Sequence, residues 1–537
     1  MRYSWGNYYV QSVKALAGND VIRGTNSADD AIWVNGTIDL GNGDDQLVGK
    51  ASGHGNYGIN LNAGRRIFGG FGSDRITGVA TGDGGVGINV DGSILTGQGV
   101  DYIDASSVDA SSVIIDEFGK VDMGTENDFI NARSLKGSGI RNYGQISTGD
   151  GNDSIRSVAN SSQWFTSYGL YNHEGASIST GRGNDIIDIL TTGNNITPLK
   201  NIGRIDTGDG SDLLKVVGGP IINQGTILTG LGNDTIQVDG NIYYDIINHG
   251  IINTGAGDDV ISALSVGFAN SSGSFLLGDG NDIVKGFGNG WFYGGLDIDK
   301  IILPEGEYVL TTVDTSKGPR KSISLPYDYP DFRFMFLSSF ETISGTSGNV
   351  FNLANGTLNI GANGEAIVNY SSATSSKIGA YQLNLTLTGA SAINGTGNIY
   401  NNTIVGNSSA NILDGKAGVD RLTGNLGADT FAFSNKPLTF TTAAVDHITD
   451  FKAGQGDMIR ISKDTFGITA STATLQIITS STELGGALAS SNLFVYDSSN
   501  GNLHWNQNGT SIGAGTGGVF AILDNKSPLI ASNIQLV

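Results

Sequence analysis

The sequence predicts an all-β protein built around a parallel β-solenoid, and three observations carry that prediction. The string Gly-x-Gly-x-Asp recurs between Gly41 and Asp282 at an average spacing of about 26 residues. Apolar and polar residues alternate on both sides of each glycine loop, as in residues 222–236, which is typical of strands with one buried face. A unit of this length holds two or three short strands and one loop, which together make one coil of a stack.

The repeating unit is longer than the loop. The string Asn-x-Gly-x-Ile-x-Thr-Gly begins at Asn142, Asn201, Asn223 and Asn248, and each copy runs directly into a glycine loop. In stacked coils the Ile and Leu side chains would form inward ladders. The repeated Asn could form a ladder of amide hydrogen bonds, as stacked strands allow.

Glycine and aspartate dominate the composition. The 537 residues include 82 Gly and only 8 Pro, which is not a collagen-like composition. Of the 51 acidic residues only 8 are Glu, so 51 − 8 = 43 are Asp, and the formal net charge is −21. This charge makes nucleic acid a poor partner.

Several classes of protein are excluded by what the sequence lacks. There is no Cys, which excludes disulfides, a thiolate metal site and a cysteine nucleophile. No window approaches the roughly 18 apolar residues of a transmembrane segment. The first residues lack the apolar run of a Sec signal peptide, so export by that route is not expected.

The loop chemistry favours calcium. Glycine at two positions allows a tight turn in which backbone carbonyl oxygens converge, and the aspartate adds a carboxylate. A set of hard oxygen ligands suits Ca²⁺ and suits zinc or copper poorly. Equivalent loops would stack about 4.8 Å apart, so an ion between them would offset the repulsion between carboxylates. Roughly ten Ca²⁺ ions, about +20 in charge, would nearly cancel the net charge of −21.

Ten aspartates that close these loops, one of them in the variant string 124–128, are the candidate calcium ligands: Asp45, Asp74, Asp101, Asp128, Asp153, Asp185, Asp212, Asp234, Asp259 and Asp282. Asp44 and Asp258 stand beside them as extra ligands or as surface charge. At residues 294–299 the pattern recurs with Asp297 in place of the second glycine. Any single copy could also be a plain turn, because Gly, Asn and Asp are ordinary turn residues.

Two tandem nonapeptides lie at residues 415–423 and 424–432, after a degenerate copy at 406–414. They resemble the RTX (hemolysin-type) calcium-binding repeat, Gly-Gly-x-Gly-x-Asp-x-apolar-x. In that family the loop carbonyls and the aspartate bind Ca²⁺, so the resemblance implicates Asp420 and Asp429. Lys416 and Asn425 stand in place of the second glycine of each copy.

The resemblance extends to an export route. Residues 446–459 are similar to the segment that follows the RTX repeats in secreted serralysin-type proteins, and residues 531–537 resemble the uncleaved signal read by type I secretion machinery. This implies a secreted or cell-surface protein of a Gram-negative bacterium, with cyanobacteria among the candidate sources. Extracellular-type sites with a Kd of roughly 10⁻⁴–10⁻³ M would be empty in the cytosol, so calcium-driven folding is expected after export.

Four segments are expected along the chain. Residues 1–301 form the calcium-loop solenoid, and residues 401–433 form the RTX β-roll. Residues 302–400 lack the motif and read as a β-rich continuation or insertion, whose aromatic stretch 327–332 is either a packed insertion or a binding patch. Residues 434–537 read as a β-rich cap with the secretion signal region.

No catalytic constellation is found in the sequence. None of the five His lies in His-Glu-x-x-His, so the zinc-protease domain of serralysins is missing. The favoured function is therefore a non-enzymatic calcium-binding protein with a structural or adhesive role, whose partners would be a cell-surface glycan or further copies of itself. The alternatives are a β-helix lyase or epimerase acting on polysaccharide, and a pore-forming toxin. A Lys/Arg/His/Tyr cluster on one solenoid face would favour the enzyme, and none is expected from the sequence.

Overall fold

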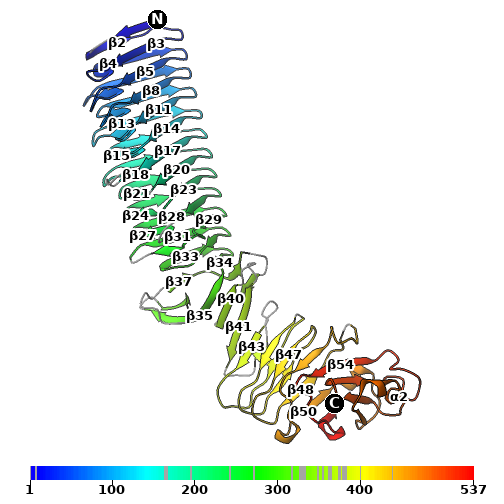
Figure 1. Cartoon of the computed structure of the whole chain (residues 1–537). Coiled ribbons are helices and arrows are strands. Elements are labelled where there is room, and N and C mark those ends of the chain that lie inside the picture. Colours follow the sequence, from blue (N-terminus) through cyan, green and yellow to red (C-terminus); the bar gives the residue numbers. More distant parts are fainter. Residues whose placement is uncertain are drawn as a thin grey trace. The chain divides into compact units, whose positions relative to one another are not determined.

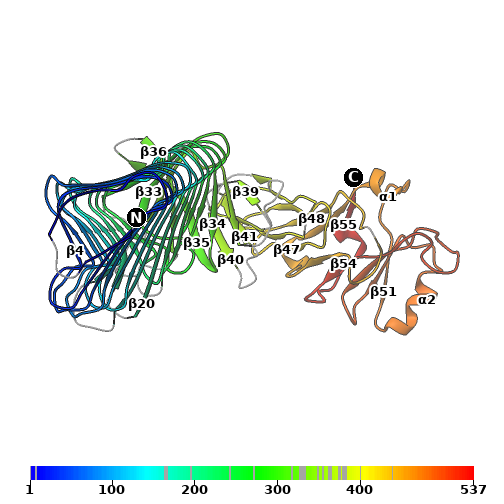
Figure 2. The same ribbon diagram turned by 90° about the horizontal axis from the view of Figure 1, so that it is seen from above.

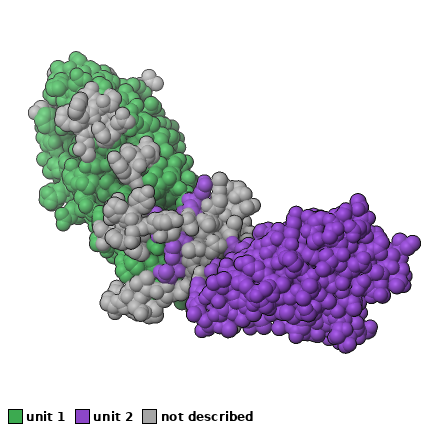
Figure 3. Space-filling view, turned by 60° about the horizontal axis from the view of Figure 1, so that its bottom comes forward, with its two compact units in different colours: residues 1–304, 313–324, 328–343 green, residues 305–312, 325–327, 344–537 purple. Residues whose placement is uncertain are grey.

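A computed structural model describes residues 2–5, 9–161, 167–193, 196–240, 244–269, 272–315, 318–325, 334–346, 350–352, 356–360, 366–372, 376–377, 384–399, 401–437 and 439–537. The aromatic stretch 327–332 lies outside the described residues. The chain divides into two compact units, coloured in Figure 3: residues 1–304, 313–324 and 328–343, and residues 305–312, 325–327 and 344–537.

The first unit is a stack of coils with three strands each, within the two or three that the repeat predicts (Figure 1). One sheet runs through the stack as β1 (Arg2–Trp5), β3 (Val21–Asn26), β5 (Gln46–Ala51), β8 (Arg75–Ala80), β11 (Tyr102–Ser107), β14 (Phe129–Ser134), β17 (Ser154–Ser161), β20 (Ile186–Gly193), β23 (Leu213–Val217), β26 (Thr235–Asp239), β29 (Val260–Ser262), β32 (Ile283–Lys285) and β34 (Lys300–Leu303). We call it the long sheet, and every pairing in it from β1 to β34 is parallel.

Two further walls complete each coil. The first contains β6 (Ile59–Leu61), β9 (Ile88–Val90), β12 (Val113–Ile115), β15 (Ile140–Asn142), β18 (Ser167–Asn172), β21 (Ile196–Asn201), β24 (Ile221–Asn223), β27 (Ile246–Asn248) and β30 (Phe268–Ala269). The second contains β7 (Arg66–Phe71), β10 (Ser93–Gln98), β13 (Lys120–Thr125), β16 (Gln145–Ser147), β19 (Ser177–Ser179), β22 (Arg204–Asp206), β25 (Thr226–Leu228), β28 (Ile251–Ala256), β31 (Ser274–Asp279) and β33 (Gly290–Leu296). At the start of the stack β2 (Tyr9–Lys14) pairs with β4 (Ile32–Asn42), which spans both walls.

In-register stacking fills the core of this unit. One inward position of the long sheet is occupied in successive coils by aliphatic side chains that are no more than 2% exposed: Ile22, Leu47, Ile76, Ile103, Ile130, Ile155, Ile187, Leu214, Ile236, Ile261, Val284 and Ile301. Seen from above in Figure 2, the strands of successive coils overlie one another. The predicted inward ladders are therefore confirmed.

The predicted amide ladder is also confirmed. The side-chain amide of Asn142 donates to Oδ1 of Asn172 at 2.9 Å, and the same contact at 2.8 Å continues through Asn201 and Asn223 to Asn248. All five residues are buried. The ladder satisfies polar groups that would otherwise be costly in the core.

The first unit ends with the hairpin of β36 (Gly318–Ser324) and β37 (Phe334–Ser338), and β37 pairs in parallel with β33. The second unit holds β35 (Gly306–Thr315) against β40 (Gly356–Ile360), which is followed by the antiparallel β41 (Ala366–Ser372). In the strand order of the long sheet, β34 is followed by β38 (Thr342–Gly345) and then by β39 (Val350–Asn352).

The β-roll of the second unit has two parallel faces. One face contains β43 (Asn384–Leu387), β45 (Thr403–Val405), β47 (Arg421–Thr423), β49 (Asp446–Ile448) and β54 (Gly518–Leu523). The other contains β42 (Ser376–Lys377), β44 (Gly395–Thr396), β46 (Ile412–Asp414), β48 (Thr430–Phe433), β50 (Met458–Ile461) and β55 (Ile534–Leu536). The residues after the nonapeptides thus continue both faces.

The remaining elements of the second unit are α1 (Lys463–Phe466), β51 (Leu475–Ile478), α2 (Leu484–Ala487), β52 (Phe494–Asp497) and β53 (Asn502–Trp505), with short 3₁₀ turns at Ala453–Gln455, Ser481–Glu483 and Ala531–Asn533. Phe431, Phe451, Phe494 and Phe520 belong to one buried cluster that joins these elements to the β-roll. Within the described part of the chain, no helix is long and apolar enough to cross a membrane.

Candidate metal centre

The ten predicted aspartates of the first unit form one continuous row. The backbone N–H of each donates to Oδ1 of the aspartate one coil further along the chain, over 2.7–3.0 Å, from Asp45 to Asp282 and on to Asp299. Each of these side chains is at most 2% exposed. The structure therefore brings together, in a single ladder, carboxylates whose successive members are 17 to 32 residues apart in the sequence.

The second carboxylate oxygen of each ladder residue, Oδ2, accepts no hydrogen bond from any described residue. Oδ2 is buried without a hydrogen-bond partner among the described atoms in Asp45, Asp74, Asp101, Asp128, Asp153, Asp185, Asp212, Asp234, Asp259, Asp282, Asp299, Asp420 and Asp429. A buried oxygen without a partner costs about 1–3 kcal/mol, and more when it is charged. A row of such oxygens fits a bound cation, and hard oxygen donors fit Ca²⁺.

The loop backbone is left-handed at both motif glycines, and it keeps that conformation where glycine is replaced. Glu126 and Asp297 stand at the second glycine position and both adopt a φ of 76°. Lys416 and Asn425, at the second glycine position of their nonapeptides, adopt φ values of 73° and 71°. Such values cost roughly 1–2 kcal/mol outside glycine, so coil stacking imposes the loop shape at these positions.

The loops fall into two main types according to the residue five positions before the aspartate. In the type that we call open loops this residue is glycine, as in Gly69, Gly415 and Gly424. A Cβ added to any of these three would overlap Oδ2 of the aspartate of its own loop, and at Gly69 also the carbonyl oxygen of Thr96 from the next coil. Gly294 and Asp299 make a fourth open loop. In an open loop the aspartate Oδ2 therefore packs directly against the glycine, where a side chain could not stand.

In the second type, which we call threonine loops, the same position carries a hydroxyl. Each donates to the backbone carbonyl of the following coil over 2.8–3.2 Å, in Thr96, Thr148, Thr180, Thr207, Thr229 and Thr254. Burial raises the pKa of Asp101 to about 6, and the Asp74 backbone N–H and the Thr96 hydroxyl oppose that rise. In a threonine loop a hydroxyl that bonds to the next coil thus stands at the position that glycine holds in an open loop.

Burial controls the ionisation of the ladder. Desolvation, together with the charge of neighbouring ladder carboxylates, raises the pKa of Asp74, Asp185 and Asp259 to about 7 and that of Asp128 to about 8. The hydrogen bond from the backbone of the preceding ladder residue acts in the opposite direction. Protons and a metal cation would therefore compete for the same oxygens near neutral pH.

This competition predicts a pH dependence for the calcium-free chain. Because the folded pKa values lie above the ordinary value of about 3.9, the stability that these carboxyls contribute is complete below that pH. It is lost as the pH rises through the folded values of about 6 to 8. We expect the chelator-treated chain, largely coil at about pH 8, to gain β-structure at about pH 5, as measured by far-UV circular dichroism. Millimolar Ca²⁺ should remove the difference, and a calcium-free chain with more β-structure at the higher pH would contradict this.

The β-roll repeats the ladder on both of its faces. Asn402 donates its backbone N–H to Oδ1 of Asp420 at 2.6 Å, and Asp420 donates to Asp446 at 2.9 Å. On the other face Asn411 donates to Asp429 at 2.8 Å, which donates to Asp457 at 3.0 Å. Burial, followed by the carboxylate of Asp446, raises the pKa of Asp420. The 18-residue step is that of two nonapeptides per coil.

Several members of the ladders lie in loops that depart from the sequence motif and were not predicted. The N–H of Asp20 donates to Oδ1 of Asp45 at 2.6 Å, although its loop retains only the glycine at Gly18. Asp446 and Asp457 close loops of a different length from the nonapeptides, so only the strand pairing reveals them. The structure also answers the question of Asp44: its Oδ1 accepts from the N–H of Ser73 at 2.9 Å on the exposed side of the loop.

Asp258 lies in the same exposed row as Asp44, where its Oδ1 accepts the N–H of Asn281 at 2.8 Å. Both residues thus take the outer place in the loop, beside the buried ladder. No group of three or more His, Asp or Glu side chains surrounds a common metal position in the described ranges. With one carboxylate per loop, the further ligands of an ion would come from backbone carbonyls.

The expectation that no Lys/Arg/His/Tyr cluster exists is wrong. Coil stacking assembles one from Arg141, Tyr143, Tyr168, Tyr171, His173 and Lys200. The His173 ring lies 3.6 Å from the centroids of both Tyr143 and Tyr171, and its Nε2 is buried. Burial, then Arg141 and Lys200, lower the pKa of His173 to about 4. A ring covered on both faces stabilises the stack, and the cluster gives no positive sign of catalysis.

The fold and the buried ladders define a class: a parallel β-solenoid with a β-roll, built from glycine and aspartate loops. The family model of the RTX calcium-binding nonapeptide repeat matches residues 5–31 and 396–431, in four copies. The chain therefore carries RTX calcium-binding repeats, as its nonapeptides predicted. The first matched range contains Asp20, and the second contains Asp420 and Asp429. No curated protein matches the sequence.

Proposed function

We propose that this chain is a calcium-binding protein exported by the type I route of a Gram-negative bacterium, that Ca²⁺ drives its folding after export, and that the folded solenoid has a structural or adhesive role at the cell surface. The observation that carries the proposal is the row of buried Oδ2 atoms without partners. The RTX repeats supply the calcium chemistry. The number of ions, roughly ten from the loop count, is part of the proposal.

The energetics support folding that waits for calcium. At about ten times Kd, each site adds roughly RT ln 11, near 1.4 kcal/mol, and ten sites add on the order of 14 kcal/mol. That sum is as large as the whole stability of a typical domain. A chain that depends on it stays unfolded where calcium is sub-micromolar and folds where calcium is millimolar.

The place of the C-terminus supports the same order of events. Residues 534–536 form β55, which pairs in parallel with β50, and the Val537 N–H donates to the Ile461 carbonyl at 3.0 Å. In the folded unit this tail is therefore a strand of the β-roll. Export machinery that reads an extended tail would have to read it before the β-roll closes.

Limited proteolysis tests the proposal. We expect the full chain to be degraded rapidly at sub-micromolar Ca²⁺ and to give a resistant product at millimolar Ca²⁺, because bound ions stabilise only the folded state. Millimolar Mg²⁺ is the control, since its octahedral geometry and tight hydration suit these loops poorly. Equal resistance with and without Ca²⁺ would contradict folding that depends on calcium.

A further inference from the structure

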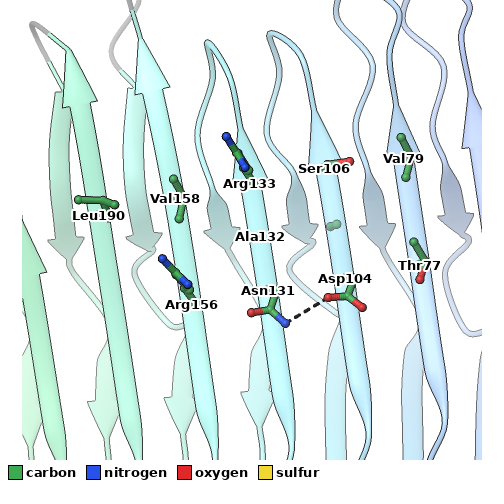
Figure 4. A pocket seen from close by; sticks show the side chains of 11 residues that line it. Thr77, Val79, Asp104, Ser106, Asn131, Ala132, Arg133, Arg156, Val158 and Leu190 are labelled. Atoms are coloured by element: carbon green, nitrogen blue, oxygen red, sulfur yellow. Dashed lines mark hydrogen bonds between the residues drawn. The ribbon is translucent and has the colours of Figure 1, made fainter.

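The outer face of the long sheet carries a hollow of about 470 Å³ that crosses β8, β11, β14, β17 and β20 (Figure 4). Its polar lining comes from Thr77, Asp104, Ser106, Asn131, Arg133 and Arg156. Because each strand belongs to a different coil, these side chains lie about 25 residues apart in sequence and become neighbours through the register alone. The hollow lies on the sheet face, away from the aspartate ladder.

Small residues inside the coil explain the hollow. One inward row of the long sheet reads Gly78, Ala105, Ala132 and Ser157, each in register with the next. A Cβ added to Gly78 would overlap the carbonyl oxygen of Gly87 on the facing wall, and Ser157 Oγ donates to the Gly169 carbonyl at 2.6 Å. The long sheet and the facing wall therefore approach closely beneath the hollow.

The row of small residues ends at β20 on one side of the hollow, and on the other side it continues through Gly49 and Gly24. The position paired with Ser157 in β20 is Ile189, followed by Val216 in β23. These larger side chains keep the walls further apart. The change from small to large inward residues thus bounds the hollow at its β20 end.

Two guanidinium groups stand over the hollow. Arg133 of β14 and Arg156 of β17 project from adjacent strands, as Figure 4 shows, and both side chains are exposed. Arg133 makes no ion pair or side-chain hydrogen bond within the described part of the chain, and Arg156 has only a 3.5 Å contact with Asp188. Two cations against the one carboxylate of Asp104 make the lining positive in a chain of net charge −21.

The polar groups beside the arginines are fixed in place. Asn131 donates to Oδ1 of Asp104 at 3.1 Å, and Arg75 pairs with Oδ2 of Asp104 at 2.7 Å. Amide, carboxylate and hydroxyl groups at Asn131, Asp104 and Ser106 are the donors and acceptors that sugar hydroxyls need. Guanidinium groups bind carboxylates through paired hydrogen bonds.

We propose that this hollow binds an anionic polysaccharide, a chain of uronic acid sugars whose carboxylates meet Arg133 and Arg156. The hollow crosses five strands at a spacing of about 4.8 Å, so it is roughly 19 Å long, which fits an extended polymer running along the solenoid. Nucleic acid fits less well, because its binding needs many cations and the chain is strongly acidic. The inference names the ligand class of the proposed adhesive role and rests on that role.

The test is calorimetric titration of the calcium-loaded full chain with hexagalacturonate, with maltohexaose as the neutral probe. We expect binding of the acidic probe only. The double variant Arg133→Ala/Arg156→Ala should weaken it by about tenfold or more, because charge-assisted contacts are lost. The matched control is Arg23→Ala/Lys50→Ala, which removes two cations from the same sheet outside the hollow and should change the affinity by less than about twofold.

Two results would overturn the site. Calcium-loaded protein that does not bind hexagalacturonate rules it out, and equal losses in the two double variants would assign binding to overall charge. Circular dichroism of the same samples separates this failure from that of the proposed function. A chain that folds with Ca²⁺ and ignores the sugar overturns the hollow alone, whereas a chain whose folding ignores Ca²⁺ overturns the proposed function.

Discussion

Replacing Gly208 with alanine is expected to destabilise the solenoid by on the order of 3 kcal/mol. Gly208 has a φ of 101°, and an added Cβ would overlap the carbonyl oxygen of Gly181 in the preceding coil. That carbonyl accepts the N–H of Asp209 at 2.8 Å, so a shift of the loop also breaks the hydrogen bond between coils. Denaturant unfolding in saturating Ca²⁺, followed by circular dichroism, measures the loss.

The matched control is Gly175→Ala in the same solenoid. Gly175 also has a positive φ, 79°, but an added Cβ meets no atom within 4 Å. Only the cost of the left-handed backbone applies there, about 1–2 kcal/mol. If both variants lose the same stability, close stacking of the loops does not determine the need for glycine at position 208.

The double variant Asp420→Asn/Asp429→Asn should change the calcium response in two opposite ways. Asparagine keeps an oxygen that can accept the bond to Oδ1, but it removes the charge that attracts Ca²⁺. We therefore expect the calcium midpoint of the β-roll to rise by about tenfold or more, because ligand charge sets affinity in such sites. In chelator the variant should keep more residual structure around Trp505 than the parent, since two buried carboxylates without partners at Oδ2 are gone. Calcium titration monitored by Trp fluorescence measures both effects, as Trp505 is buried in this unit.

The control for charge alone is Asp464→Asn/Glu483→Gln, which neutralises two exposed carboxylates of the same unit. It should leave the calcium midpoint and the residual structure in chelator almost unchanged. If Asp420→Asn/Asp429→Asn has no more residual structure than the parent in chelator and keeps the parent's calcium midpoint, the two aspartates are structural and do not bind the ion.

Periodicity was enough to predict the ladder. Residues at equal positions of a repeat must stack in a solenoid, so Asp74 and Asp101 could be placed together without coordinates. The same logic predicted the row of Asn201 and Asn223, and the structure adds Asn172 to it. Asp20 and Asp457 were missed because their loops depart from the glycine spacing, and it is strand pairing that brings them into the rows.

The difference between the loop types could not be predicted from the motif. Gly69 and Thr96 occupy equivalent places, and only the structure shows that the glycine lies against Oδ2 of Asp74 while the threonine hydroxyl bonds to the next coil. The hollow was missed for a related reason. Arg133 and Arg156 are 23 residues apart and lie outside every motif, so their proximity depends on register and on the small residues beneath them.

The most direct test of the central claim is a Ca²⁺ titration of the chelator-treated full chain, followed by far-UV circular dichroism. Buried aspartate oxygens that require a cation predict a cooperative transition from coil to β-structure at roughly 0.1–10 mM Ca²⁺, the range of extracellular-type sites. A full β-signal in chelator, unchanged by Ca²⁺, would show that the loops hold without metal and would contradict calcium-driven folding.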